Sequence, residues 1–110
     1  MFASSHEQPW EPVSHNEALR KQVFLSNGQV PHVTQFAQSI FPPGESAPAH
    51  HHDDMWESFF VAEGNLTLLS NNERHQFVAG DQVTIAPGES HELRNEGSVP
   101  LRLIYFSVLA

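Results

Sequence analysis

The sequence predicts an all-β fold, either a sandwich or a barrel, and three observations support this prediction. Short apolar segments recur along most of the chain, and turn-forming pairs such as Asn-Gly and Pro-Gly separate them about every 8 to 12 residues. A long helical stretch is missing, because only residues 17–22 could form a helical turn, and this segment is too short to be stable alone. With 110 residues, the chain is expected to form one domain around a single core.

The N-terminal part of the chain differs from the rest in composition. Residues 1–16 are rich in Ser, His, Glu and Pro, and we expect them to form an extended arm that precedes a domain of residues 17–110. Trp10 and Val13 are expected to anchor this arm on the domain or on another subunit, because large apolar side chains are usually packed.

The expected strands follow in order, and each ends at a turn signal. The first covers residues 22–26 and ends at Asn27-Gly28, a pair typical of hairpins. The second covers residues 32–41 and has apolar residues on both faces, so we expect it to be covered on both sides. Further strands are expected over residues 57–62, 66–69, 75–78, 82–85, 90–94 and 101–108.

The composition limits the partners of the protein. Five Lys and Arg residues face thirteen Asp and Glu residues, so the clustered cations that bind nucleic acid are missing and no such partner is expected. No apolar run approaches the roughly 20 residues of a membrane span, and residues 1–10 lack the apolar core of a signal peptide. We therefore expect no membrane association and a cytoplasmic location. Because cysteine is absent, any metal must be held by His and carboxylate groups.

Three consecutive histidines followed by a carboxylate form the most informative stretch. In a strand, His50 and His52 point to one face and His51 to the other. Glu57 lies an odd number of positions after His52, so a turn at Asp53-Asp54 is expected to reset the alternation. Imidazole and carboxylate groups are the usual ligands of Zn, Fe, Mn, Ni or Cu. The stretch therefore predicts a metal site, and the alternative is a histidine-rich surface patch.

A four-residue repeat connects this stretch with a second region of the chain. Residues 43–46 read Pro-Gly-Glu-Ser, and residues 87–90 repeat them. Each copy leads into a segment with a histidine, His50 in the first case and His91 in the second. The repeat predicts that two turns bring two strands to one site, with His91 as a fourth ligand. Coincidence is the alternative, since Pro-Gly is a favoured turn pair.

These residues resemble the two motifs of the cupin superfamily. The first motif is a glycine, five residues, His-x-His, three or four residues, Glu, six residues and a glycine, and it is matched by Gly44, His50, His52, Glu57 and Gly64. The second motif is matched at its glycines, histidine and asparagine, by Gly80, Gly88, His91 and Asn95. Its proline falls on Ala86, which we expect to alter a turn and not a ligand. Asn95 is expected to make a structural turn contact.

The resemblance to a small single-domain cupin implies a fold and a cofactor. The implied fold is the double-stranded β-helix, a jelly-roll barrel of six to eight strands. One divalent transition-metal ion (Fe, Mn, Ni, Cu or Zn) would lie inside the barrel, held by His50, His52, Glu57 and His91. Members of this family commonly form homodimers, and the N-terminal arm is a candidate for the dimer contact.

Two functions are compatible with this resemblance. Cupins with this ligand set include dioxygenases, decarboxylases, isomerases and lyases, so the first hypothesis is a metal-dependent enzyme for a small oxygenated organic molecule. In such an enzyme Glu57 would stay a metal ligand or act as a catalytic base. The second hypothesis is a non-catalytic module that binds or senses a small molecule, because no separate general base or catalytic lysine stands out.

The substrate pocket is expected close to the metal ligands. Its wall is predicted to include apolar and uncharged polar side chains, namely Met55, Trp56, Phe59, Gln35, Ser39 and Tyr105. An aromatic-rich cavity with few cations favours a neutral or aromatic polyol, enol or keto compound over a sugar phosphate.

Overall fold

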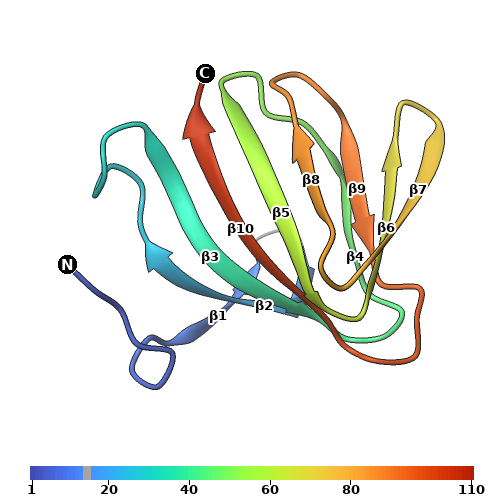
Figure 1. Ribbon diagram of the computed structural model, residues 1–110, viewed down its shortest axis with the longest axis horizontal. Coiled ribbons are helices and arrows are strands. Elements are labelled where there is room, and N and C mark those ends of the chain that lie inside the picture. The colour runs from blue at the N-terminus through green and yellow to red at the C-terminus, as the bar shows by residue number, and fades with distance from the viewer. Residues whose placement is uncertain (14–15) are drawn as a thin grey trace.

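A computed structural model describes residues 1–13 and 16–110, and all regular elements within these ranges are β-strands (Figure 1). The prediction of an all-β fold is therefore confirmed. The described residues form no helix that is long and apolar enough to cross a membrane. The strands are β1 (Trp10–Val13), β2 (Asn16–Leu25), β3 (Val33–Phe41), β4 (Ser46–His50), β5 (Met55–Glu63), β6 (Asn65–Ser70), β7 (Glu73–Val78), β8 (Gln82–Ile85), β9 (His91–Arg94) and β10 (Leu101–Leu109).

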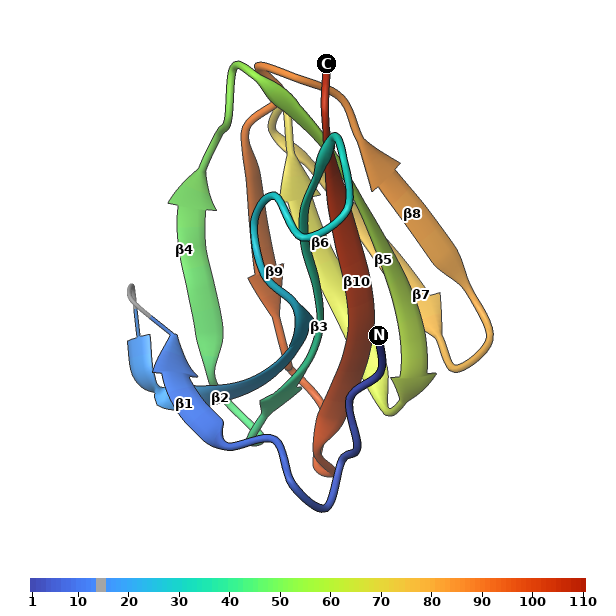
Figure 2. The same cartoon turned by 90° about the vertical axis from the view of Figure 1, so that its left-hand side faces the viewer.

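The strands form two antiparallel sheets that face each other (Figure 2). One sheet has the order β1-β2-β3-β10-β5-β8 and the other the order β4-β9-β6-β7. The eight strands from β3 to β10 have jelly-roll connectivity, because the chain passes back and forth between the two sheets. The implied double-stranded β-helix is thus confirmed, and β1 and β2 extend the larger sheet beyond β3.

Residues 17–22, which could have formed a helical turn, are part of a strand in the structure. These residues belong to β2, which pairs with β1 on one side and with β3 on the other. Leu19 is fully buried between the sheets while its neighbours Ala18 and Arg20 are exposed, as expected for a strand. Pairing along both edges of the strand outweighs the weak local preference for a helix.

Part of the expected N-terminal arm is a strand of the larger sheet. Val13, at the end of β1, packs against the hydrophobic core, as expected for an anchor, whereas Trp10 remains 40% exposed. Residues 14–15 lie outside the described ranges. The division into an arm of residues 1–16 and a domain of residues 17–110 stays a prediction.

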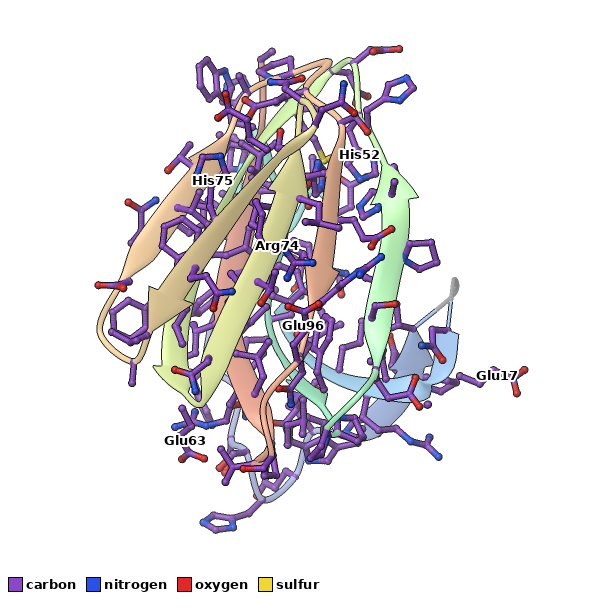
Figure 3. The ribbon with its side chains drawn as sticks, turned by 90° about the vertical axis from the view of Figure 1, so that its right-hand side faces the viewer. Glu17, His52, Glu63, Arg74, His75 and Glu96 are labelled. Atoms are coloured by element: carbon purple, nitrogen blue, oxygen red, sulfur yellow. The ribbon has the colours of Figure 1, made fainter. Side chains whose placement is uncertain are left out.

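The hydrophobic core fills one end of the space between the sheets and leaves the other end to polar groups. Along β5 the inward side chains pass from Glu57 through Phe59 to Val61, which is fully buried. Burying a side chain such as Val61 or Leu103 stabilises the fold by about 1.5–3 kcal/mol. In Figure 3, His52 marks the polar end and Glu63 marks the opposite end.

A buried amide network holds the N-terminal segment on the outer face of the larger sheet. The Gln22 side chain is fully buried, and its Nε2 donates to the carbonyl oxygens of Ser5 and Gln8 at 2.9 Å each. Its Oε1 accepts a hydrogen bond of 2.7 Å from Gln38 on β3. At Gln38, therefore, β3 is covered on its outer face as well as on its inner face.

Asn95 stabilises the loop that follows β9. Its side chain is almost fully buried, and Nδ2 donates to the carbonyl oxygens of Phe41 at 2.9 Å and Val99 at 2.8 Å. Its Oδ1 accepts from the backbone N–H of Gly97 at 3.0 Å. The expected structural turn contact of Asn95 is confirmed.

Substitution of Gly64 by alanine should destabilise the protein far more than substitution of Gly28. Both glycines have positive φ, 81° and 86°, but a Cβ atom at Gly64 would lie 2.5 Å from the carbonyl oxygen of Pro100, while nothing lies within 4 Å at Gly28. We expect a loss of about 3 kcal/mol for Gly64→Ala and about 1 kcal/mol for Gly28→Ala. Urea unfolding measures both, and equal losses would contradict the close approach at Gly64.

Candidate metal centre

The pairing of β4 with β9 places two of the predicted ligands side by side. His50 and His91 are cross-strand partners, and their ring centroids lie 4.3 Å apart. A register shift lies between Ala47 and His50, so the last residues of β4 do not continue the regular ladder. This irregularity occurs at the polar end of the barrel.

The two copies of the Pro-Gly-Glu-Ser repeat form equivalent turns. The carbonyl oxygen of Pro42 accepts from the N–H of Glu45 at 3.1 Å, and that of Ala86 accepts from Glu89 at 3.1 Å. The glycine in each turn, Gly44 or Gly88, has the positive φ that a type II turn requires at this position, 86° and 79°.

Each of these turns also bonds to the end of the strand that follows the other turn. The N–H of Gly44 donates to the carbonyl oxygen of Asn95 at 2.9 Å, just after β9. The N–H of Gly88 donates to the carbonyl oxygen of His52 at 2.7 Å, just after β4. The two strands that follow these turns thus lie side by side, and their delivery to one functional site stays a prediction.

Glu57 reaches this place from the other sheet. A bend at residues 53–54 precedes β5, as predicted, and the Glu57 carboxylate points inward with its side chain only 12% exposed. Glu57 Oε1 lies 3.2 Å from His91 Nε2 and 3.5 Å from His52 Nε2. His51 is exposed, in agreement with its predicted position on the opposite face.

Three of the four predicted ligands form a compact group. One ligand atom each from His50, Glu57 and His91 lies within 4.8 Å of the others. His52 is outside this group, although its ring centroid is 5.1 Å from that of His50.

The backbone fixes the tautomers of two histidines. The Nδ1 of His50 lies 2.8 Å from the carbonyl oxygen of Pro48, and the Nδ1 of His91 lies 3.0 Å from that of Glu89. Since a carbonyl oxygen only accepts, Nδ1 carries the proton in both rings and donates it. In the neutral rings the lone pair then lies on Nε2, which is the tautomer that binds a metal through Nε2.

His91 Nε2 is a buried polar atom that a metal ion would satisfy. The side chain is 1% exposed, and within residues 1–13 and 16–110 this nitrogen is the buried side-chain atom that has no hydrogen-bond partner. Its contact with Glu57 does not have hydrogen-bond geometry. Buried polar atoms without partners are unfavourable and rare. The residues present therefore fit a metal ion.

The electrostatics of the group favour the protonation states that metal binding needs at Glu57 and His50, but not at His91. Burial opposes the charge of Glu57, but the contact with His91 and the neighbouring imidazoles outweigh it and lower the Glu57 pKa. Burial is the main cause of the lowered pKa of His50. Burial would also lower the pKa of His91, but the Glu57 carboxylate outweighs this effect and raises it. A metal entering the site would therefore compete with a proton on His91.

A cavity of about 170 Å³ adjoins the group. Four of the predicted pocket residues line it, namely Gln35, Ser39, Phe59 and Tyr105. Met55 and Trp56 are not among its lining residues. Because Glu57 points inward, strand alternation directs Trp56 outward, and it is 44% exposed.

Tyr105 is a neutral polar group in the cavity wall. Its ring stacks on that of Phe59 with centroids 5.5 Å apart, and its hydroxyl donates to Gln35 Oε1 at 3.0 Å. Burial raises the pKa of Tyr105 above its ordinary value, so the phenol keeps its proton at neutral pH.

Lys21 lines the same cavity and was missed by the sequence reasoning. It is the only lysine in the sequence, and it lies in the segment for which the sequence allows a helical turn and predicts no strand up to residue 21. Strand alternation places it two positions after Leu19, on the same inward face. The cavity therefore holds a cation next to its aromatic residues, which the composition alone did not indicate.

The chain is similar in sequence to known cupins. The family model described as "Cupin domain" matches residues 37–108. An uncharacterised protein of Methanocaldococcus jannaschii is 31% identical over 68 residues, which cover 62% of this chain and 54% of that protein. The oxalate-binding protein of Thermotoga maritima is 30% identical over 74 residues, which cover 67% and 61%. The matches thus span little more than half the length of these curated relatives.

The fold is also similar to solved structures. The crystal structure of a predicted oxalate decarboxylase from Thermotoga maritima superposes with a TM-score of 0.90 at 25% identity, and the match covers 100% of both chains. The agreement extends to the whole chain, including the N-terminal residues that lie before the family match.

Replacement of His91 should abolish metal retention, while replacement of an exposed histidine should not. We expect His91→Ala to lower the metal content of purified protein to less than about a tenth of the wild-type value. Loss of a residue that only hydrogen-bonds to a metal ligand already lowers metal affinity about 10–100-fold, and loss of the ligand itself should cost more. His75→Ala is the matched control, because its side chain is 45% exposed and its ion-pair partner is Glu73, away from the candidate site. Elemental analysis measures both, and equal metal content in the two variants would contradict the site.

Proposed function

The chain belongs to the cupin domain family, and we propose that it is a metal-dependent cupin enzyme that acts on a small oxygenated organic molecule. The observation that carries this proposal is the buried His91 Nε2, which lacks a hydrogen-bond partner and faces Glu57 and His50. We propose His50, His52, Glu57 and His91 as the ligands of one divalent transition-metal ion. Oxygen and imidazole donors suit Fe, Mn, Ni, Cu and Zn.

Each residue of the site would have a distinct role in this enzyme. A bound metal would supply Lewis acidity to adjacent oxygens of the substrate. The carbonyl oxygens of Pro48 and Glu89 would hold the rings of His50 and His91 in orientation. Glu57 would act as a ligand or accept a proton from the substrate, because its lowered pKa keeps it ionised.

The cavity wall supports a small substrate that contacts both aromatic and polar side chains. A volume of about 170 Å³ suits a molecule of a few heavy atoms, well below the size of a drug-like ligand. Phe59 and Tyr105 supply an aromatic wall, and the Tyr105 hydroxyl and Gln35 offer polar contacts. The relatives named for oxalate support an oxygen-rich ligand of this size.

The alternative function is a cupin that binds or senses a small molecule without changing it. One observation favours it, because a relative of 30% identity is named an oxalate-binding protein. The residues that line the cavity also include no Asp or Glu other than Glu57 that could act as a separate base.

Turnover screens on metal-loaded protein distinguish the two functions. We expect oxygen uptake with small phenols or diketones, or product formation under nitrogen with small oxygenated acids and sugars. The double variant His50→Ala/His52→Ala should lose this turnover together with its metal. If the wild-type protein holds stoichiometric metal and binds these compounds but converts none of them, the binding function is correct and the enzyme is excluded.

We also propose that the protein is a homodimer that pairs through the outer face of the larger sheet. Large apolar side chains on this face remain exposed, at 42% for Phe60 and 46% for Phe106. Trp56 lies on the same face of the sheet. Strands β5 and β10 pair there, with Phe60 opposite Ile104 and Trp56 opposite Val108. Contiguous exposed apolar residues are typical of protein interfaces. The cytoplasmic location stays a prediction.

Introduction of a charge on this face should separate the subunits. We expect light scattering to give a mass of twice 12.3 kDa for the wild type and close to 12.3 kDa for Phe106→Glu. The physical reason is the cost of burying an unpaired carboxylate in an apolar interface. Glu17→Lys, an exposed change on β2, is the control and should remain dimeric. A monomeric wild type would contradict the proposal.

A further inference from the structure

We infer that Lys21 makes the cavity selective for small molecules that carry a carboxylate in addition to the oxygens that reach the metal. This inference rests on the proposed function, because it specifies the chemistry of the molecule bound at the same site. Lys21 would contact that carboxylate directly and would not be a metal ligand.

The strand pairing places Lys21 on the inward face of the larger sheet. Its cross-strand partners are Ser39 on β3 and Glu11 on β1. Side chains of cross-strand partners project to the same side of a sheet, and Ser39 lines the cavity together with Lys21. The Lys21 side chain is 22% exposed, so most of it is packed while it lines the cavity.

Lys21 is the one Lys or Arg among the residues that line this cavity. A cation in a partly buried wall is unfavourable unless an anion compensates it. Within the described ranges, the carboxylate that forms an ion pair with Lys21 is that of Glu11, whose Oε1 is 3.8 Å from Nζ and whose side chain is 50% exposed. This separation exceeds hydrogen-bonding distance. The three donors of the ammonium group can therefore turn to a ligand in the cavity.

The surroundings favour a carboxylate over a phosphate. One ammonium group that Glu11 partly compensates matches a single negative charge, whereas a phosphate monoester carries close to two. The Ser39 hydroxyl and the Gln35 amide line the same wall and can add neutral hydrogen bonds to a carboxylate. His50, His52 and Glu57 line the cavity as well, so one molecule can meet the metal ligands and Lys21. A neutral ligand, as the composition suggested, would leave Lys21 without this partner.

A pair of matched probes tests the inference on Ni²⁺-loaded protein. L-Lactate and L-malate share the 2-hydroxy acid group that chelates a metal, and malate adds one carboxylate. We expect calorimetry to give malate an affinity at least about tenfold higher than lactate in the wild type. Lys21→Met should remove this difference by weakening malate about tenfold or more, and should leave metal content and lactate affinity within about twofold.

Arg20→Met is the matched control for this experiment. It removes the same charge from the adjacent position, but Arg20 is exposed on the opposite face of β2 and should not affect malate. Glu11→Gln removes the competing carboxylate, so it should raise malate affinity, and a loss of affinity would contradict the inference. Because Glu11→Gln keeps Lys21 in place, it tests the inference even if Lys21→Met fails to fold.

The outcomes separate the two proposals. If wild type and Lys21→Met both hold Ni²⁺ and bind malate equally well, the role of Lys21 is wrong while the metal site stands. Wild-type protein that holds Ni²⁺ and binds malate no better than lactate also overturns the inference. If the wild type retains no metal at all, the proposed function itself fails and the inference fails with it.

Discussion

The antiparallel pairing of β4 with β9 is the constraint on which the candidate site depends. It places His50 opposite His91, and a register shift between Ala47 and His50 interrupts the regular ladder just before this pair. The two type II turns before these strands, at Gly44 and Gly88, bond to the end of each other's strand. A change in the Gly88 turn, which precedes His91 and bonds to His52, would therefore shift these histidines relative to Glu57, which comes from the opposite sheet.

The division of the barrel interior into an apolar end and a polar end explains how the fold accommodates this group. Buried leucines and Val61 close one end, and Asn95 and Gly64 hold the loops there. The stability obtained from that core allows the other end to keep a buried carboxylate, a buried imidazole with a polar atom lacking a partner, and a cavity. Such an arrangement is unfavourable for folding alone, which is why it indicates a function.

Much of the site could be predicted from the sequence because it follows from local rules. Alternation in a strand separates His51 from its neighbours, and the Pro-Gly turns mark the starts of β4 and β9. Lys21 could not be found in this way, because residues 17–22 have only a weak local preference and become a strand through pairing with β1 and β3. For Trp56 the same alternation that directs Glu57 inward would have predicted an outward position. The cavity itself depends on packing between the two sheets, which no short segment determines.

The central claim is that imidazole groups positioned by β4 and β9 bind one metal ion together with the Glu57 carboxylate. X-ray absorption at the metal edge of protein loaded with one equivalent of Ni²⁺ tests it most directly, because imidazole rings give characteristic outer-shell scattering. The account predicts scattering from two to three imidazoles and a first shell of nitrogen and oxygen near 2.0–2.2 Å, a range of the order known for such ligands. A spectrum with oxygen neighbours alone and no imidazole scattering would contradict it.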